Sequence, residues 1–215
     1  MKVLDSLPEP KILKKLMRIQ AALNIILCQD DWLRYHYYVQ TWNDDVSMAK
    51  IDDGSGNHFI ILFSSKGTII KGFDHESELS PYAQDEHEVW PGIYEFVPHG
   101  LLSLLDDEAV EKNDVTFCVW HEHNDVRWQT GKVKIPKEAD DGFGFFLNTI
   151  CHTPKDFVEF AEDYFEITPL MDIVEKIYKH FPITVEMIRL LNPESDSEEV
   201  LRELESSGLL STEDL

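Results

Sequence analysis

Apolar residues recur at helical spacing between residues 10 and 27. Every third or fourth position there is Ile or Leu, while Lys11, Lys14, Lys15 and Arg18 fall largely on the remaining positions. This spacing predicts an amphipathic helix. Its basic face is unusual in this chain. It is either an ordinary solvated face, a partner for acidic surface elsewhere in the protein, or a docking site.

Between residues 33 and 73 the period changes to two, and β-branched and aromatic residues dominate. Four such runs occur in order: RYHYYVQTW, VSMAKID, HFIILFS and TIIKGF. Each break carries turn residues, and Gly67 supplies the positive φ that a short hairpin needs. The pattern predicts a four-stranded antiparallel meander. Two more strands are expected at 115–120 and 126–133, so that the sheet has about six strands.

The segment 74–113 contains three prolines and no sustained period. It is too long for a plain connector. Segments of this length inside a compact domain are usually functional or contain short helices.

Helical patterning returns after Lys137. The runs lie at 144–151, 154–165, 169–181, 185–191 and 198–204. Thr153 is expected as the N-cap and Pro154 as the first helical residue of the second run. From residue 184 onward nine acidic residues face two arginines, which indicates an acidic helical tail.

These elements predict an α+β fold. We expect an antiparallel meander sheet with an N-terminal amphipathic helix and with C-terminal helices packed on one face. Two parts are predicted, an α+β domain over 1–166 and an acidic helical appendage over 167–215.

Charge narrows the class of partner. The chain carries 41 Asp and Glu against 19 Lys and Arg, a formal net charge of -22 over 215 residues. Coulomb repulsion opposes binding to nucleic acid or to anionic lipid, and it favours basic proteins or multivalent cations. The hydrophobic fraction of 43%, with 12 Phe, 7 Tyr and 5 Trp, excludes general disorder.

Cysteine usage and the chain start indicate a cytoplasmic protein. Cys28, Cys118 and Cys151 are odd in number, lie in apolar surroundings and form no CxxC pair, so we expect reduced thiols. A catalytic Cys151 beside His152 is disfavoured, because nucleophile and base are normally assembled across a fold. The first ten residues lack the apolar core of a signal peptide, and no run is long enough to span a membrane.

Asp74, His75 and Glu76 form the densest cluster of chemically active side chains. A carboxylate beside a histidine suits acid/base chemistry or a divalent metal, which makes a metal-dependent hydrolase the alternative function. Neighbouring side chains on a strand point to opposite faces, so all three converge only if the chain bends. The competing interpretation is a polar loop in which Asp74 and Ser77 bond to the backbone.

His121 and His123 have the i, i+2 spacing that lets two imidazoles on a strand share one Zn²⁺ or Ni²⁺. A further ligand would come from Asp125 or, across the fold, from His75 or His87. A polar hairpin tip accounts for the same residues without a metal. The chain contains no GxSxG elbow, phosphate-binding glycine loop, HExxH or CxxC motif, and no cofactor is expected.

The five tryptophans are either core residues or parts of an exposed aromatic patch framed by carboxylates. The second arrangement has the composition of a hot spot for a cationic protein. The segment 82–90 combines both features, and its candidate partner-binding residues are Tyr82, Asp85, Glu86, Glu88 and Trp90.

Three strings, IILFSSKGTIIKGFDHESELSPY, WPGIYEFVP and TFCVWHEHNDVRWQTGKV, resemble an uncharacterised bacterial protein family over roughly residues 32–164. The resemblance implies a bacterial cytosolic origin, and it assigns no active residue. For such families, neutralising a toxin or another protein-binding task is a frequent proposal. Chiefly because of the acidic charge, we expect a non-enzymatic, immunity-like module that binds a basic protein.

Overall fold

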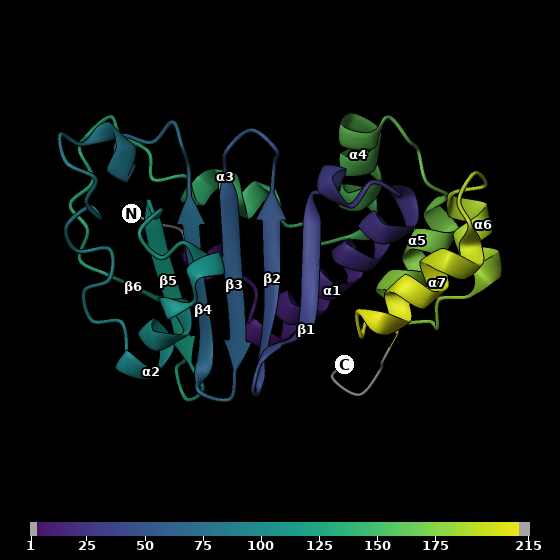
Figure 1. Ribbon diagram of the computed structural model, residues 1–215, viewed down its shortest axis with the longest axis horizontal. Helices are drawn as coiled ribbons and strands as arrows, with labels where there is room; N and C mark the ends of the chain where they lie inside the picture. Colours follow the sequence, from purple (N-terminus) through teal and green to yellow (C-terminus); the bar gives the residue numbers. More distant parts are fainter. Residues whose placement is uncertain (1–3, 211–215) are drawn as a thin grey trace. The chain divides into compact units, whose positions relative to one another are not determined.

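The computed structural model describes residues 4–210, drawn in Figure 1. The described residues divide into two compact units. Unit 1 comprises residues 4–13 and 41–149, and unit 2 comprises residues 14–40 and 150–210. Each unit is therefore assembled from segments that are far apart in the sequence.

The strands are β1 (His36–Asn43), β2 (Val46–Asp52), β3 (His58–Ser64), β4 (Gly67–Phe73), β5 (Phe117–Glu122) and β6 (Gln129–Thr130). The α-helices are α1 (Pro10–Leu27), α2 (His99–Leu102), α3 (Phe143–Asn148), α4 (Pro154–Phe165), α5 (Met171–Tyr178), α6 (Val185–Leu191) and α7 (Ser197–Ser206). Single turns of 3₁₀ helix are η1 (Leu4–Ser6), η2 (Asp31–Leu33), η3 (Pro81–Ala83), η4 (Ser103–Asp106) and η5 (Glu108–Val110).

The six strands lie in the sheet in their sequence order, so the α+β meander is confirmed (Figure 1). Each pair of neighbouring strands from β2 to β6 is antiparallel. The longest connection joins β4 to β5, and it contains α2, η3, η4 and η5. The expectation that this segment contains short helices is therefore confirmed.

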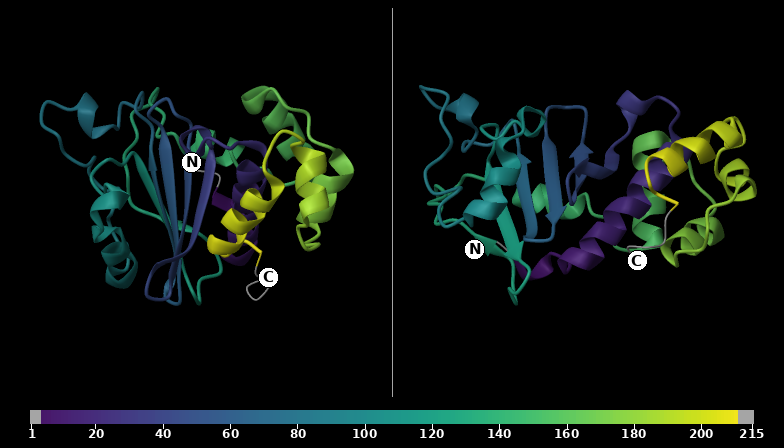
Figure 2. Two further views of the ribbon diagram at one scale, coloured as in Figure 1. Left: turned by 45° about the vertical axis from the view of Figure 1, so that its right-hand side comes forward. Right: turned by 60° about the horizontal axis from the view of Figure 1, so that its bottom comes forward.

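The central strands of unit 1 are covered on both faces. Gly72 pairs with Phe59 and with Phe117, and these two rings contact the phenylalanines of α3 on one face. Lys71 precedes Gly72 and so points to the opposite face, where its Nζ donates to the Val110 carbonyl at 2.9 Å. Figure 2 shows α2 and α3 on opposite sides of the sheet. The unbroken apolar run of β3 is the sequence feature that requires this double cover.

The sixth strand is shorter than the predicted 126–133. Only Thr130 and Gln129 pair with β5, opposite Val119 and Trp120. Trp128 is buried just before this short strand, and its Nε1 donates to the Pro8 carbonyl at 2.9 Å. Its side chain thus holds the segment before α1 rather than extending the ladder.

The basic face predicted for α1 is not solvated along its whole length. Lys11 is exposed, but every residue from 16 to 27 is buried. Arg18 is 4% exposed, and it donates from Nη1 to Gln40 Oε1 at 2.7 Å and from Nη2 to the Gly208 carbonyl at 3.0 Å. Arg18 is therefore a buried link inside unit 2.

Two buried amides on α1 serve as partners for distant backbone. Gln20 exchanges a pair of 3.2 Å hydrogen bonds with the backbone of Cys151, which is 131 residues away. One turn later, Asn24 Oδ1 accepts from the backbone nitrogens of Tyr35 and His36 at 2.9 and 3.1 Å. Both side chains stabilise unit 2 because buried backbone groups need partners.

The helices after residue 150 belong to the same compact unit as residues 14–40. Helix α4 has its predicted bounds, and Thr153 forms a capping box with Asp156. The Asn192 amide donates to the Ile26 carbonyl at 3.0 Å, which ties the end of α6 to α1. The predicted boundary after residue 166 falls inside this unit, between α4 and α5. The last five residues of the predicted appendage lie outside the described residues.

Candidate functional site

An open pocket of about 820 Å³ lies in unit 1. We call it the acidic pocket. It is lined by Gln84, Asp85, Glu86, Glu88, Val89, Trp90, Pro91, Gly92, Glu95, Lys132 and Lys134. Four of the five predicted partner-binding residues are among these, and the structure therefore brings most of that predicted set to one place.

Two glycines allow the two sides of the acidic pocket to approach each other. Gly92 has φ +92°, and a Cβ there would lie 2.5 Å from the Lys132 carbonyl oxygen. A Cβ on Gly131 would lie 2.0 Å from the Gly92 oxygen. Ile93 is fully buried and anchors the segment next to Trp90. The loop that contains Gly92 can lie directly against the segment after β6, because neither glycine has a side chain that would keep the two backbones apart.

The pocket lining is mixed in charge with an acidic excess. Asp85, Glu86, Glu88 and Glu95 stand against Lys132 and Lys134, and all six side chains are exposed. Trp90 is half-buried among them. A large aromatic surface bordered by carboxylates attracts a cationic group through the electron-rich ring face and through Coulomb forces.

Tyr82, the fifth predicted partner-binding residue, does not line the acidic pocket. Its hydroxyl donates to Asp114 Oδ2 at 3.1 Å, and this hydrogen bond is the main cause of a raised pKa for Tyr82. Its ring meets the His87 ring edge-on with 4.6 Å between centroids. Tyr82 is nevertheless 65% exposed, and it belongs to a separate surface cluster.

Asp74, His75 and Glu76 follow β4 in a turn. Asp74 Oδ1 accepts from the Glu76 backbone nitrogen at 3.0 Å. His75 Nδ1 lies 2.9 Å from Asn57 Oδ1. Ser77 donates from Oγ to the Asp140 carbonyl. These are the backbone and turn contacts of a polar loop. Within the predicted set, His75 Nε2 also lies 4.0 Å from Glu76 Oε1.

His121 lies in β5 opposite Thr68 of β4, whereas Asp125 lies in the β5–β6 connection. His121 is buried, and its Nδ1 lies 2.8 Å from the Glu122 carbonyl oxygen. Asp125 Oδ2 accepts from the Glu122 backbone nitrogen at 2.9 Å, whereas His123 is exposed. Across residues 4–210, no three His, Cys, Asp or Glu side chains are arranged to hold a metal ion. The predicted set of His121, His123 and Asp125 is thus not assembled as a ligand group in the described chain.

A pair formed by the buried Lys71 and the half-buried His58 was missed at the sequence level. Lys71 Nζ donates to the carbonyls of Val110 and Glu111, both at 2.9 Å, and lies 3.1 Å from His58 Nε2. Burial lowers the pKa of Lys71 to about 8. Burial and the neighbouring Lys71 ammonium lower the pKa of His58 to about 4. The sequence did contain one indication of this pair, because Lys71 interrupts the apolar run that forms β4.

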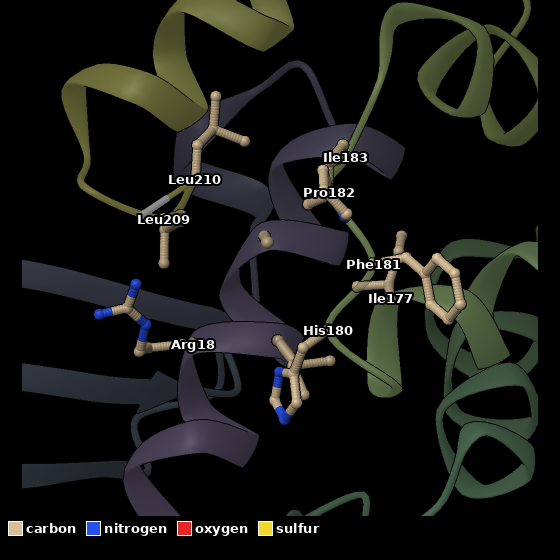
Figure 3. Close-up of a pocket in the computed structure, with 10 residues that line it drawn as sticks. Arg18, Ile177, His180, Phe181, Pro182, Ile183, Leu209 and Leu210 are labelled. Carbon is tan, nitrogen blue, oxygen red and sulfur yellow. The ribbon is translucent and has the colours of Figure 1, made fainter. Parts of the chain in front are cut away.

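Unit 2 contains a small hollow over α1, shown in Figure 3. It is lined by Arg18, Ile19, Ala22, Ile177, His180, Phe181, Pro182, Ile183, Leu209 and Leu210. Its volume of about 50 Å³ admits about four waters at roughly 10–15 Å³ each. Burial is the first cause of a lowered pKa for His180, ahead of the nearby cations. The hollow is too small for an organic substrate.

The fold and the acidic pocket together define an acidic α+β protein with an open aromatic and carboxylate-rich site. Comparisons with protein-family models, with curated proteins and with solved structures found no match. In the described part of the chain, no helix has the length and apolar character needed to cross a membrane.

Proposed function

We propose that this chain is a non-enzymatic, cytoplasmic interaction protein, immunity-like in its mode of action. It binds a basic protein, such as a nuclease, through the carboxylates and the indole of the acidic pocket. The observation that carries the proposal is the gathering of Trp90 with Asp85, Glu86 and Glu88 around one open pocket. Those residues combine the aromatic anchor and the opposite charge that a cationic partner requires.

Charge has two roles in the proposed binding, one at long range before contact and one at the pocket itself. The net charge of -22 speeds the encounter with a basic protein by roughly 10- to 1000-fold at low salt. The local carboxylates then select the contact. Lys132 and Lys134 on the same pocket repel misplaced cations, and such repulsion is a common source of specificity.

The test is affinity capture with the full chain at low salt from a lysate of the encoding organism. Bound proteins are eluted with rising salt and identified by mass spectrometry. The pocket variant carries Asp85→Asn, Glu86→Gln and Glu88→Gln. We expect one basic protein that elutes at moderate salt from the wild type and is lost from the pocket variant.

The matched control carries Glu162→Gln, Asp163→Asn and Glu186→Gln. These three residues are exposed in unit 2, and their replacement changes the net charge by the same amount. Because long-range attraction falls equally in both variants, only a contact at the acidic pocket separates them. Equal loss from both variants contradicts a pocket-specific site, and failure to retain any basic protein contradicts the proposed function.

A further inference from the structure

The most exposed tryptophan in the described chain belongs to unit 2 and is not part of the segment 82–90. Trp32 is 74% exposed, and its neighbour Leu33 is 40% exposed. Both belong to the single turn η2, between α1 and β1. An indole left in solvent forgoes a large amount of hydrophobic stabilisation, which a role in binding would offset.

The backbone of this turn is braced from several sides. Tyr37 donates its hydroxyl to the Asp31 carbonyl at 2.8 Å, and Tyr164 donates to the Leu33 carbonyl at 3.2 Å. The backbone nitrogen of Leu33 donates to the Asp30 carbonyl at 3.0 Å. Trp32 therefore stands on a rigid support, and a rigid anchor loses little conformational entropy when it binds.

The charges beside the turn are negative. Asp30 and Asp31 are exposed, and the Asp30 side chain makes no capping hydrogen bond to the turn. Arg34, the nearest cation in sequence, is engaged by partners other than these two carboxylates. Its guanidinium forms a bidentate pair with Glu203 on α7, and its Nε donates to the Cys28 carbonyl at 2.9 Å.

We infer that the turn around Trp32 is a docking point for an arginine or lysine side chain of a basic protein partner. The cation lies over the indole face, and Asp30 and Asp31 pair with its N–H groups. Glu203 already pairs with Arg34, so the nearest cation in sequence is engaged, and we assign the cation of this site to the partner. The inference rests on the proposed function, since both require a basic partner, but it uses a different surface.

The test uses ¹⁵N-labelled full-length protein and two short peptides at low salt. One is acetyl-Gly-Arg-Gly-Arg-Gly-amide, and the other replaces both arginines by citrulline, which keeps the shape and removes the charge. Substitution Trp32→Phe identifies the Trp32 indole N–H signal. We expect the arginine peptide to shift this signal and the citrulline peptide to leave it in place.

Variants then measure the strength of the contact. Trp32→Ala is expected to weaken binding of the arginine peptide by roughly 2- to 5-fold, the range for an exposed cation–π contact. The double variant Asp30→Asn, Asp31→Asn keeps the shape of the turn and is expected to weaken it as well. Val126→Ala, at an exposed apolar residue of unit 1, is the control and should bind as the wild type does.

The outcomes separate the two proposals. A shift of the Trp90 indole without a shift of Trp32 overturns the present inference and leaves the proposed function standing. A shift of Trp32 alone supports the inference and removes support from the acidic pocket. Equal shifts with the citrulline peptide overturn recognition of a cation. A Trp32 shift that follows protein concentration without peptide identifies a second copy as the occupant, and it also overturns the inference.

Discussion

Acid sensitivity centred on His58 is the sharpest prediction of this structure. The His58 imidazole is 13% exposed, and its Nε2 lies 3.1 Å from the Lys71 ammonium. A proton on that nitrogen removes one of the three acceptors of Lys71 and places two positive charges in contact, with the Glu111 carboxylate 3.6 Å from the same nitrogen. Burial and Lys71 accordingly lower the pKa of His58 from 6.5 to about 4.

Proton linkage gives the direction in which pH changes the free energy of unfolding. Between pH 6.5 and pH 4 the unfolded chain binds a proton at this histidine and the folded chain does not, so the free energy of unfolding falls as the pH falls. The slope approaches about 1.4 kcal/mol per pH unit, and the total reaches about 3 kcal/mol at pH 4. That loss is a large part of the roughly 5–15 kcal/mol by which domains are stable. Above pH 6.5 the contribution of His58 is fully present.

The assay is urea unfolding of the wild type and of His58→Gln between pH 7.5 and pH 4.5. Glutamine has a carbonyl oxygen that accepts from Lys71 but gains no proton in this range. The difference in unfolding free energy between wild type and variant should therefore shift by about 2 kcal/mol in favour of the variant as the pH falls. His123→Gln, at an exposed position of the same unit, is the matched control. Parallel pH profiles for wild type and His58→Gln would refute this account of the pair.

Two stability predictions concern packing and capping. Gly72→Ala should destabilise by about 2 kcal/mol or more, because its Cβ would lie 2.0 Å from the buried Phe117 ring. Gly144→Ala, where a Cβ meets nothing within 4 Å, is the control, and thermal unfolding of both variants decides the point; equal melting temperatures contradict it. Thr153→Ala should cost about 1 kcal/mol, since its Oγ1 accepts from the Asp156 nitrogen at 3.2 Å. Urea unfolding measures this loss, and an unchanged midpoint counts against the capping argument.

Local patterning was sufficient for most elements of the fold. The period of two and the turn residues between runs place β1 to β4, because strands with one set of inward positions pair through short turns. Thr153 followed by Pro154 places the start of α4, where an N-cap and a ring-restricted residue leave little choice. Helix α5, predicted over 169–181, is shorter, because it begins only after Leu170 and ends before His180, which adopts φ +59°.

Buried polar residues were the main failure of sequence reasoning. Gln20, Arg18 and Lys71 are polar by type, and so a period-based argument assigns them to solvent. Their partners are backbone carbonyls and amides as far as 190 residues away, and nothing local in the sequence indicates them. Only the folded chain supplies the hydrogen-bond partners that offset the cost of burying these polar groups.

For the candidate sites too, some features could be predicted from the sequence and others required the folded structure. The sequence by itself determined the acidic charge, the meander of strands, and the close spacing of Trp90 with three carboxylates. Tertiary structure alone decided that these side chains share one pocket with Lys132 and Lys134, and that Trp32 is exposed on a braced turn. The physical reason is the distance along the chain over which each property is determined. Charge, period and turn chemistry are local properties of a chain, whereas exposure and the facing of side chains depend on which distant segments pack together.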